Sequence, residues 1–299
     1  MPEMPYLLTA MVTPFTEQYE LDVPRARELA RKLVQEGSDG LVVTGTTGES
    51  PTLSKEEKLA LYEAVKEEVG EEVCVVAGTG GNNTAASVEL TEAAENTGVD
   101  MIMAVVPYYN KPSAEGLYEH FKAIAQATKL PVILYNVPSR TGSNMSAKTV
   151  AQLARDVPNI VAVKEASGDM QQVADIRAQT PEEFVIYSGN DGDTLPILAL
   201  GGRGVISVAS HIVGRELREM IDSFHRGEAK RALELHLKLL PIFKACFVPG
   251  SPNPCPVKAA LRMVGFDVGP PRLPLVEPNA EQKTAIRDAL CAFGLEVCA

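Results

Sequence analysis

One lysine stands where an ammonium group would be poorly solvated. Lys164 follows the apolar run from Ile160 to Val163, which is typical of a buried strand. Burial disfavours the charged form of a lysine and lowers its pKa. A neutral amine can attack a carbonyl carbon and form an iminium, which is an electron sink for carbon–carbon bond chemistry. An ion pair with a carboxylate such as Glu165 is the alternative, and the position of Lys164 alone leaves both open.

Further polar segments also follow apolar runs. Residues 45–48 have the composition of a turn whose backbone N–H groups bind a carboxylate, although a plain turn is the alternative. Arg140 can bind a second carboxylate with two guanidinium nitrogens, or lie at the surface. Tyr109 and Tyr135 can relay protons with a threonine hydroxyl, but a single tyrosine at a strand end is often a packing residue.

The remaining reactive side chains lack the spacing that other chemistries need. The four histidines form no metal-binding pattern and no triad with a serine or cysteine. The five cysteines are odd in number and form no CxxC pair, so we expect reduced thiols in a cytoplasmic protein. Metal and hydrolytic chemistry are therefore disfavoured.

Charge and hydropathy exclude two classes of partner. A formal net charge of −11 argues against nucleic acid and anionic membrane surfaces. No apolar run approaches the roughly 20 residues that span a bilayer. The first residues lack the basic start and apolar core of a signal peptide, so none is expected.

The elements that must position these residues alternate regularly. Eight short apolar runs are predicted as parallel strands: 7–12, 40–44, 74–78, 101–106, 132–136, 160–165, 184–188 and 204–208. Amphipathic segments lie between them, including 23–36, 55–69, 84–97 and 114–128; Ser54 and Glu57 form a capping box before the second. Without a glycine signature after the first strand, the pattern favours a closed (β/α)₈ barrel over an open sheet.

Two domains are expected, a catalytic barrel over residues 1–227 and a C-terminal helical extension over 228–299. Helices are predicted at 211–227, 229–243, 256–265 and 281–294, and the loop 248–256 contains four prolines. A barrel gathers the carboxyl ends of its strands at one face, so the polar segments should meet there.

The motifs together resemble those of the dihydrodipicolinate synthase family of pyruvate-dependent, Schiff-base-forming barrels. The similarity runs from Leu7 to about Leu290 and is carried by GTTGES, PYYNKPSAEGLYEHF, LYNVPSRTG, VKEASGD, YSGND, GVISV and NPCPVK. Arg140 and the Tyr-Tyr-Asn segment favour the synthase over related sugar-acid lyases.

The resemblance implies a role for each matching residue. Lys164 would form the Schiff base with pyruvate, Tyr135 would carry protons with Thr46 as its hydroxyl partner, and Tyr109 would reach into a neighbouring subunit's site. Thr47 would hold the pyruvate carboxylate through its backbone, and Arg140 the carboxylate of L-aspartate 4-semialdehyde. Gly189 and Ile206 would line the pocket beside the lysine. The implied assembly is a homotetramer, a dimer of dimers, that needs no cofactor or metal.

Two departures from the family pattern stand out. The lysine-inhibition site would comprise Ser50, Lys55, Lys58, Asn82, Ala86 and Tyr108. Lysine-sensitive members carry histidines at the positions of Lys55 and Lys58 and a glutamate at that of Ala86, so we expect weak or absent inhibition by the cationic amino acid. The loop before Pro256 is longer than usual, and we expect it to lie far from the chemistry.

Two other functions remain open at this point. Another pyruvate-dependent aldolase would cleave N-acetylneuraminate or a keto-sugar acid, but Arg140 suits a carboxylate rather than a polyol. A non-catalytic paralogue would bind a keto acid without turnover. The joint presence of Lys164, Tyr135, Thr46 and Tyr109 argues against the second.

Overall fold

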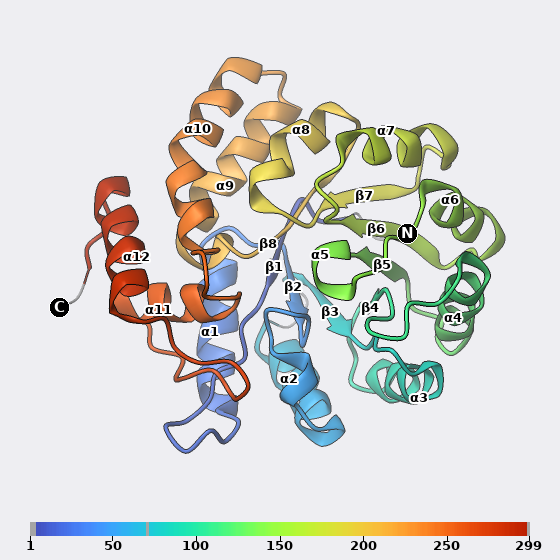
Figure 1. Ribbon diagram of the computed structural model, residues 1–299, viewed down its shortest axis with the longest axis horizontal. Coiled ribbons are helices and arrows are strands. Elements are labelled where there is room, and N and C mark those ends of the chain that lie inside the picture. Colours follow the sequence, from blue (N-terminus) through green and yellow to red (C-terminus); the bar gives the residue numbers. More distant parts are fainter. Residues whose placement is uncertain (1–3, 70–71, 298–299) are drawn as a thin grey trace.

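A closed barrel of eight parallel strands forms the centre of the molecule (Figure 1). The computed structural model describes residues 4–69 and 72–297. Each strand pairs with its neighbour in sequence, and the eighth closes on the first. This confirms the predicted (β/α)₈ fold. The strands are β1 Leu7–Ala10, β2 Gly40–Val43, β3 Cys74–Gly78, β4 Met101–Val105, β5 Val132–Asn136, β6 Ile160–Glu165, β7 Val185–Ser188 and β8 Gly204–Ser207.

Helices surround the barrel, and most lie within two residues of the predicted bounds. Ser54 and Glu57 exchange the two hydrogen bonds of the predicted capping box before α2. The helices are α1 Val23–Gln35, α2 Lys55–Val69, α3 Thr84–Glu95, α4 Ala114–Gln126, α5 Pro138–Thr141, α6 Ala147–Asp156, α7 Met170–Gln179, α8 Thr194–Ala199, α9 Ser210–His225, α10 Ala229–Ala245, α11 Cys255–Met263 and α12 Ala280–Phe293; the short 3₁₀ turns are η1 Ser50–Thr52 and η2 Asp191–Asp193.

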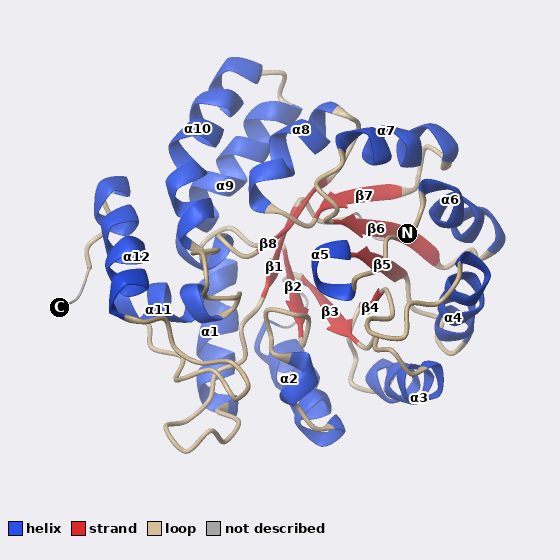
Figure 2. Ribbon diagram, in the orientation of Figure 1, coloured by secondary structure: helices blue, strands red, loops and turns tan. Residues whose placement is uncertain are grey.

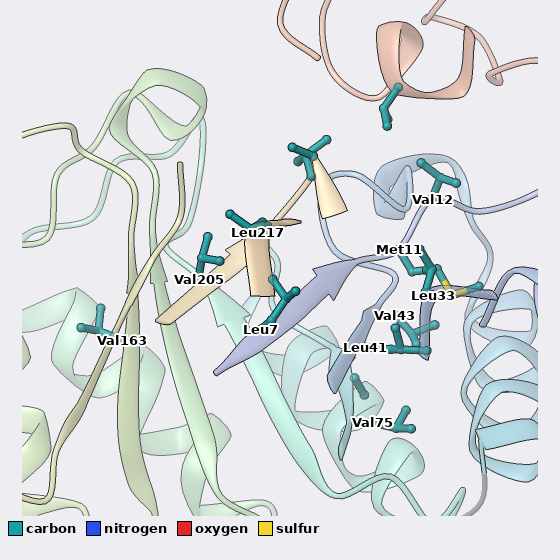
Figure 3. Close-up of a cluster of buried hydrophobic side chains, with 14 of the residues drawn as sticks. Leu7, Met11, Val12, Leu33, Leu41, Val43, Val75, Val163, Val205 and Leu217 are labelled. Carbon is teal, nitrogen blue, oxygen red and sulfur yellow. The ribbon is translucent and has the colours of Figure 1, made fainter. Parts of the chain in front are cut away.

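Alternation along the strands builds two apolar cores. Leu8 and Val42 point into the barrel and pack in a cluster that also contains Tyr135. Their neighbours Leu7 and Leu41 point outward and join the larger core between barrel and helices (Figure 3). Since side chains of a strand alternate between two faces, each buried strand supplies both cores. This explains the near-continuous apolar runs in the sequence.

The last three helices lie on one side of the barrel. Figure 2 shows α10, α11 and α12 beside α9 and α1, across the molecule from α3 and α4. The helix α10 packs against α9 and α12. These helices follow the eighth β/α unit, as the sequence predicts, while the domain boundary at residue 227 stays a prediction.

Four cysteines are free thiols, namely Cys74, Cys246, Cys255 and Cys291. The fifth, Cys298, lies outside the described residues. Within 4–69 and 72–297, no helix has both the length and the apolar character to cross a membrane.

Candidate active site

Lys164 lies inside the barrel at the carboxyl end of β6. It is 4% exposed, and its Nζ lies 4.3 Å from the centroid of the Tyr135 ring. The two residues are direct partners in the β5–β6 register. Burial lowers the pKa of the Lys164 ammonium to about 7; the charge of Asp191 opposes this shift and that of Arg140 adds to it. A substantial fraction of this amine is therefore neutral at physiological pH.

The alternative ion pair between Lys164 and Glu165 is wrong. Adjacent strand residues point to opposite faces, so Glu165 faces away from the barrel interior. Its carboxylate accepts hydrogen bonds from Asn136 Nδ2 at 3.1 Å, from the Ser167 backbone N–H at 2.8 Å and from Gln172 Nε2 at 3.1 Å. Lys164 makes no ion pair with any residue that the structure describes.

Asp191 supplies a buried negative charge that acts on Lys164, a role that the sequence did not suggest. Its carboxylate accepts from the Ser207 hydroxyl and from the backbone N–H groups of Val208 and Ala209. Burial raises the pKa of Asp191, whereas these hydrogen bonds and the charge of Lys164 lower it. The carboxylate is thus fixed at the start of the β8–α9 connection. Only its position just after the seventh strand could have indicated in the sequence that Asp191 belongs to the site.

Thr46 and Tyr135 lie together beside the lysine. Burial raises the pKa of the Tyr135 phenol, and the Thr46 hydrogen bond and the charge of Arg140 oppose that shift. Thr46, Tyr135 and Arg140 all line a cavity of about 250 Å³ at the carboxyl ends of β2 to β5. The predicted meeting of polar segments at this end of the barrel is therefore confirmed.

The turn that contains Thr47 is held by its own backbone. The Glu49 N–H donates to Thr46 O at 3.1 Å, and the Ser50 N–H donates to Gly45 O at 3.3 Å. Thr47 is 3% exposed, and its hydroxyl accepts from Asn253 Nδ2 at 2.9 Å. Hydrogen bonds within the turn and one from Asn253 thus hold Thr47 at the site.

The expectation that loop 248–256 lies far from the site is wrong. Asn253 contacts Thr47, and its backbone oxygen accepts from a guanidinium nitrogen of Arg140 at 3.2 Å. The helices α9 and α10 have similar lengths and pack against each other, so α10 carries the chain back to the end of the barrel where α9 began. No local pattern around Asn253 signals this return.

Gly189 and Ile206 both lie near the strands that carry Lys164 and Tyr135. The Gly189 N–H donates to Glu165 O at 2.7 Å, and a Cβ on Gly189 would lie 2.5 Å from the Cβ of Ala166. Only glycine permits this approach of β7 to β6. Ile206 is fully buried in the inner cluster with Tyr135. Neither residue lines the cavity, and their contact with substrate stays a prediction.

Tyr109 is not brought to Lys164 within one chain. Its side chain is 89% exposed, its backbone is left-handed with φ of 72°, and it does not line the cavity described above. The preceding residue, Tyr108, does line it.

The six residues of the expected lysine site have different surroundings. Ser50 and Tyr108 line the cavity, and Asn82 Nδ2 donates to the Tyr108 backbone oxygen at 3.3 Å. Lys55 is paired with Glu89. Lys58 is half-buried, with its pKa lowered by burial, and Ala86 is exposed near the start of α3.

Fold and site together define a class of enzyme. A (β/α)₈ barrel that presents a desolvated lysine, a buried tyrosine and an arginine at the carboxyl ends of its strands is suited to Schiff-base chemistry on acidic carbonyl substrates. Within the described residues, no group of three or more His, Cys, Asp or Glu side chains is placed to hold a metal ion.

Comparison with known proteins identifies the family. The sequence model of the dihydrodipicolinate synthetase family matches residues 4–293. The 4-hydroxy-tetrahydrodipicolinate synthase of Moorella thermoacetica is 56% identical over 289 residues, covering 97% of this chain and 98% of that protein. A dihydrodipicolinate synthase structure from Bacillus anthracis matches with a TM-score of 0.94 at 48% identity, over 98% of this chain and 99% of that one.

A third relative was solved with lysine bound. The enzyme of Cyanidioschyzon merolae matches with a TM-score of 0.95 at 46% identity, over 97% of this chain and 98% of that one. This chain belongs to the dihydrodipicolinate synthetase family.

Proposed function

We propose that this chain is a cytoplasmic lyase that condenses pyruvate with L-aspartate 4-semialdehyde to give 4-hydroxy-tetrahydrodipicolinate, in the diaminopimelate route to lysine. The observation that carries the proposal is the desolvated Lys164 amine against the Tyr135 ring. The names of close relatives and the family match support the same activity.

The first half of the reaction uses the interior of the barrel. The neutral Lys164 amine attacks the pyruvate carbonyl carbon, and loss of water gives a protonated iminium. Tyr135 and Thr46 transfer protons to and from the carbonyl oxygen as it becomes water. The backbone of Thr47 holds the pyruvate carboxylate. The buried Asp191 carboxylate stabilises the positive charge of the iminium.

The second half makes the new carbon–carbon bond. The iminium loses a methyl proton to become an enamine, whose carbon attacks the aldehyde carbon of the second substrate. The resulting alkoxide takes a proton from Tyr135. The amino group of the former semialdehyde then attacks the iminium carbon, and Lys164 leaves as an amine. Arg140 at the cavity binds the semialdehyde carboxylate.

The proposal includes a homotetramer built as a dimer of dimers. Tyr109 is exposed and lies outside its own chain's cavity, so it can complete the proton relay only in a neighbouring subunit. No cofactor, metal, nucleic acid or membrane takes part.

The test is reductive trapping followed by an assay of condensation. Borohydride with pyruvate should add a reduced pyruvate unit to Lys164, and peptide mass analysis locates it. Lys164→Ala should abolish the adduct, while Lys148→Ala, at an exposed lysine on α6, should leave it unchanged.

The outcomes separate the competing functions. Trapping together with condensation of aspartate semialdehyde supports the synthase. Trapping without condensation indicates another pyruvate-dependent aldolase. Absence of any adduct on Lys164 refutes the Schiff-base mechanism and leaves a keto-acid-binding protein.

A further inference from the structure

A buried ion pair joins the Thr46–Thr47 turn to the C-terminal helices. Lys258 Nζ of α11 lies 2.6 Å from Glu49 Oε1, and the two side chains are 2% and 0% exposed. Neither residue contacts Lys164 or Tyr135 in any interaction described above. The pair is therefore separate from the reacting groups but adjacent in sequence to the turn that holds them.

Among the described residues, the side-chain partners of Glu49 outside its own turn all come from one segment of the chain. Its second carboxylate oxygen accepts from the Arg272 backbone N–H at 2.8 Å. Lys258 Nζ also donates to Pro270 O at 3.2 Å and lies 4.5 Å from the centroid of the Phe15 ring. The Arg272 guanidinium donates to Thr52 O at 2.9 Å, just beyond the turn. Residues 258–272 thus hold the turn from outside the barrel.

Glu49 links these contacts to the active site. Its backbone is left-handed with φ of 55°, and its N–H donates to Thr46 O. An unfavourable backbone conformation persists only where surrounding contacts enforce it. A displacement of the Glu49 side chain would therefore move Thr46 and Thr47, which lie three and two residues before it.

Stability alone is a poor reason for such a pair. Burying two charges costs about as much as their attraction returns, and an apolar replacement of similar size is often as stable. We infer that the Glu49–Lys258 pair positions Thr46 and Thr47 for pyruvate. Glu49 and Lys258 are therefore positioning residues for the first half-reaction. This inference rests on the roles proposed above for Thr46 and Thr47.

The test compares a broken pair with a neutralised pair. Lys258→Met leaves a buried, unpaired carboxylate, while the double variant Glu49→Gln/Lys258→Met removes both charges. Both should lower kcat/KM for pyruvate, by roughly 100-fold if the turn moves by about 1 Å. The value of kcat/KM for aspartate semialdehyde should change much less. The unfolding midpoint should fall in the single variant and recover in the double variant.

Lys66→Met is the control for loss of an ion pair, at a pair that is less buried than Glu49–Lys258. Lys66 is paired with Asp100 near the amino-terminal end of β4, on the opposite face of the barrel. This variant should lose some stability and keep kcat/KM for pyruvate within about threefold, as expected for a pair remote from the site.

A second measurement needs no substrate. Backbone amide exchange over residues 45–52 should be faster in the double variant than in the wild type and unchanged in Lys66→Met. Recovery of pyruvate kcat/KM together with stability in the double variant, or unchanged exchange over 45–52, would overturn the inference. Failure of the proposed function itself would show instead as absence of a pyruvate adduct on wild-type Lys164.

Discussion

The reactivity of Lys164 depends on the residues that surround it. Burial and Arg140 lower the pKa of its ammonium to about 7, against the pull of Asp191. Below that pH the ammonium has no lone pair for attack, and above it the amine is free. We therefore expect kcat/KM for pyruvate to rise with pH and to level off above about 7. Initial rates from about pH 5 to about pH 9 would check this. A profile that still rises at about pH 9 would mean that the pKa of Lys164 is that of an ordinary lysine.

Arg140 is the residue that we propose to bind the carboxylate of the second substrate. Arg140→Ala should lower kcat/KM for aspartate semialdehyde by roughly 10- to 100-fold, the range for losing a hydrogen bond to a charged group. Arg140→Lys should recover only part of this loss, because lysine cannot bind a carboxylate with two parallel hydrogen bonds. Pyruvate trapping on Lys164 should persist in both variants. Equal losses for the two substrates would argue against this assignment.

Among the elements, the contact of β7 with β6 sets the shape of the site. A Cβ at Gly189 would meet the Cβ of Ala166 at 2.5 Å, two residues after Lys164. Gly189→Ala should destabilise the fold by about 1–3 kcal/mol and lower activity through displacement of β6. Denaturant unfolding and pyruvate kinetics would measure both effects.

Gly192 provides the control at the same loop. A Cβ there would meet nothing within 4 Å, so Gly192→Ala should change stability by less than about 0.5 kcal/mol. Equal effects of the two substitutions would show that the close approach of β7 to β6 is unimportant.

For the whole molecule, the question is whether one chain holds a complete site. If Tyr109 acts in a neighbouring subunit, Tyr109→Phe and Lys164→Ala are each inactive alone but complement each other. A two-fold mixed dimer would contain one intact site, so an equal mixture refolded together should regain about a quarter of wild-type activity. Absence of complementation would place Tyr109 outside the relay.

A further prediction at this scale concerns the response to lysine. Lys55 and Lys58 place two amines in the region that we propose for lysine binding, although Lys55 is paired with Glu89, and Ala86 supplies no carboxylate there. We expect added L-lysine to inhibit the initial rates weakly or not at all. The triple variant Lys55→His, Lys58→His, Ala86→Glu should gain sensitivity. Inhibition of the wild type at low lysine concentration would contradict this prediction.

Local sequence patterns were enough to predict the fold and the main candidate for a catalytic residue. Apolar runs and amphipathic segments report which faces are buried, and their strict alternation admits few architectures. They predicted the closed barrel and singled out Lys164 at the end of β6. They also predicted that the polar segments at the strand ends would gather at one face.

Tertiary structure decided how the site is held. The sequence left open whether Lys164 pairs with Glu165, and the strand's alternation together with the Asn136 and Gln172 contacts excluded that pairing. Asn253 contacts Thr47 across 206 residues of chain. Such contacts depend on where whole helices return the chain, which no local spacing encodes. The chemistry was therefore visible in the sequence, but the residues that position it were visible only in the folded molecule.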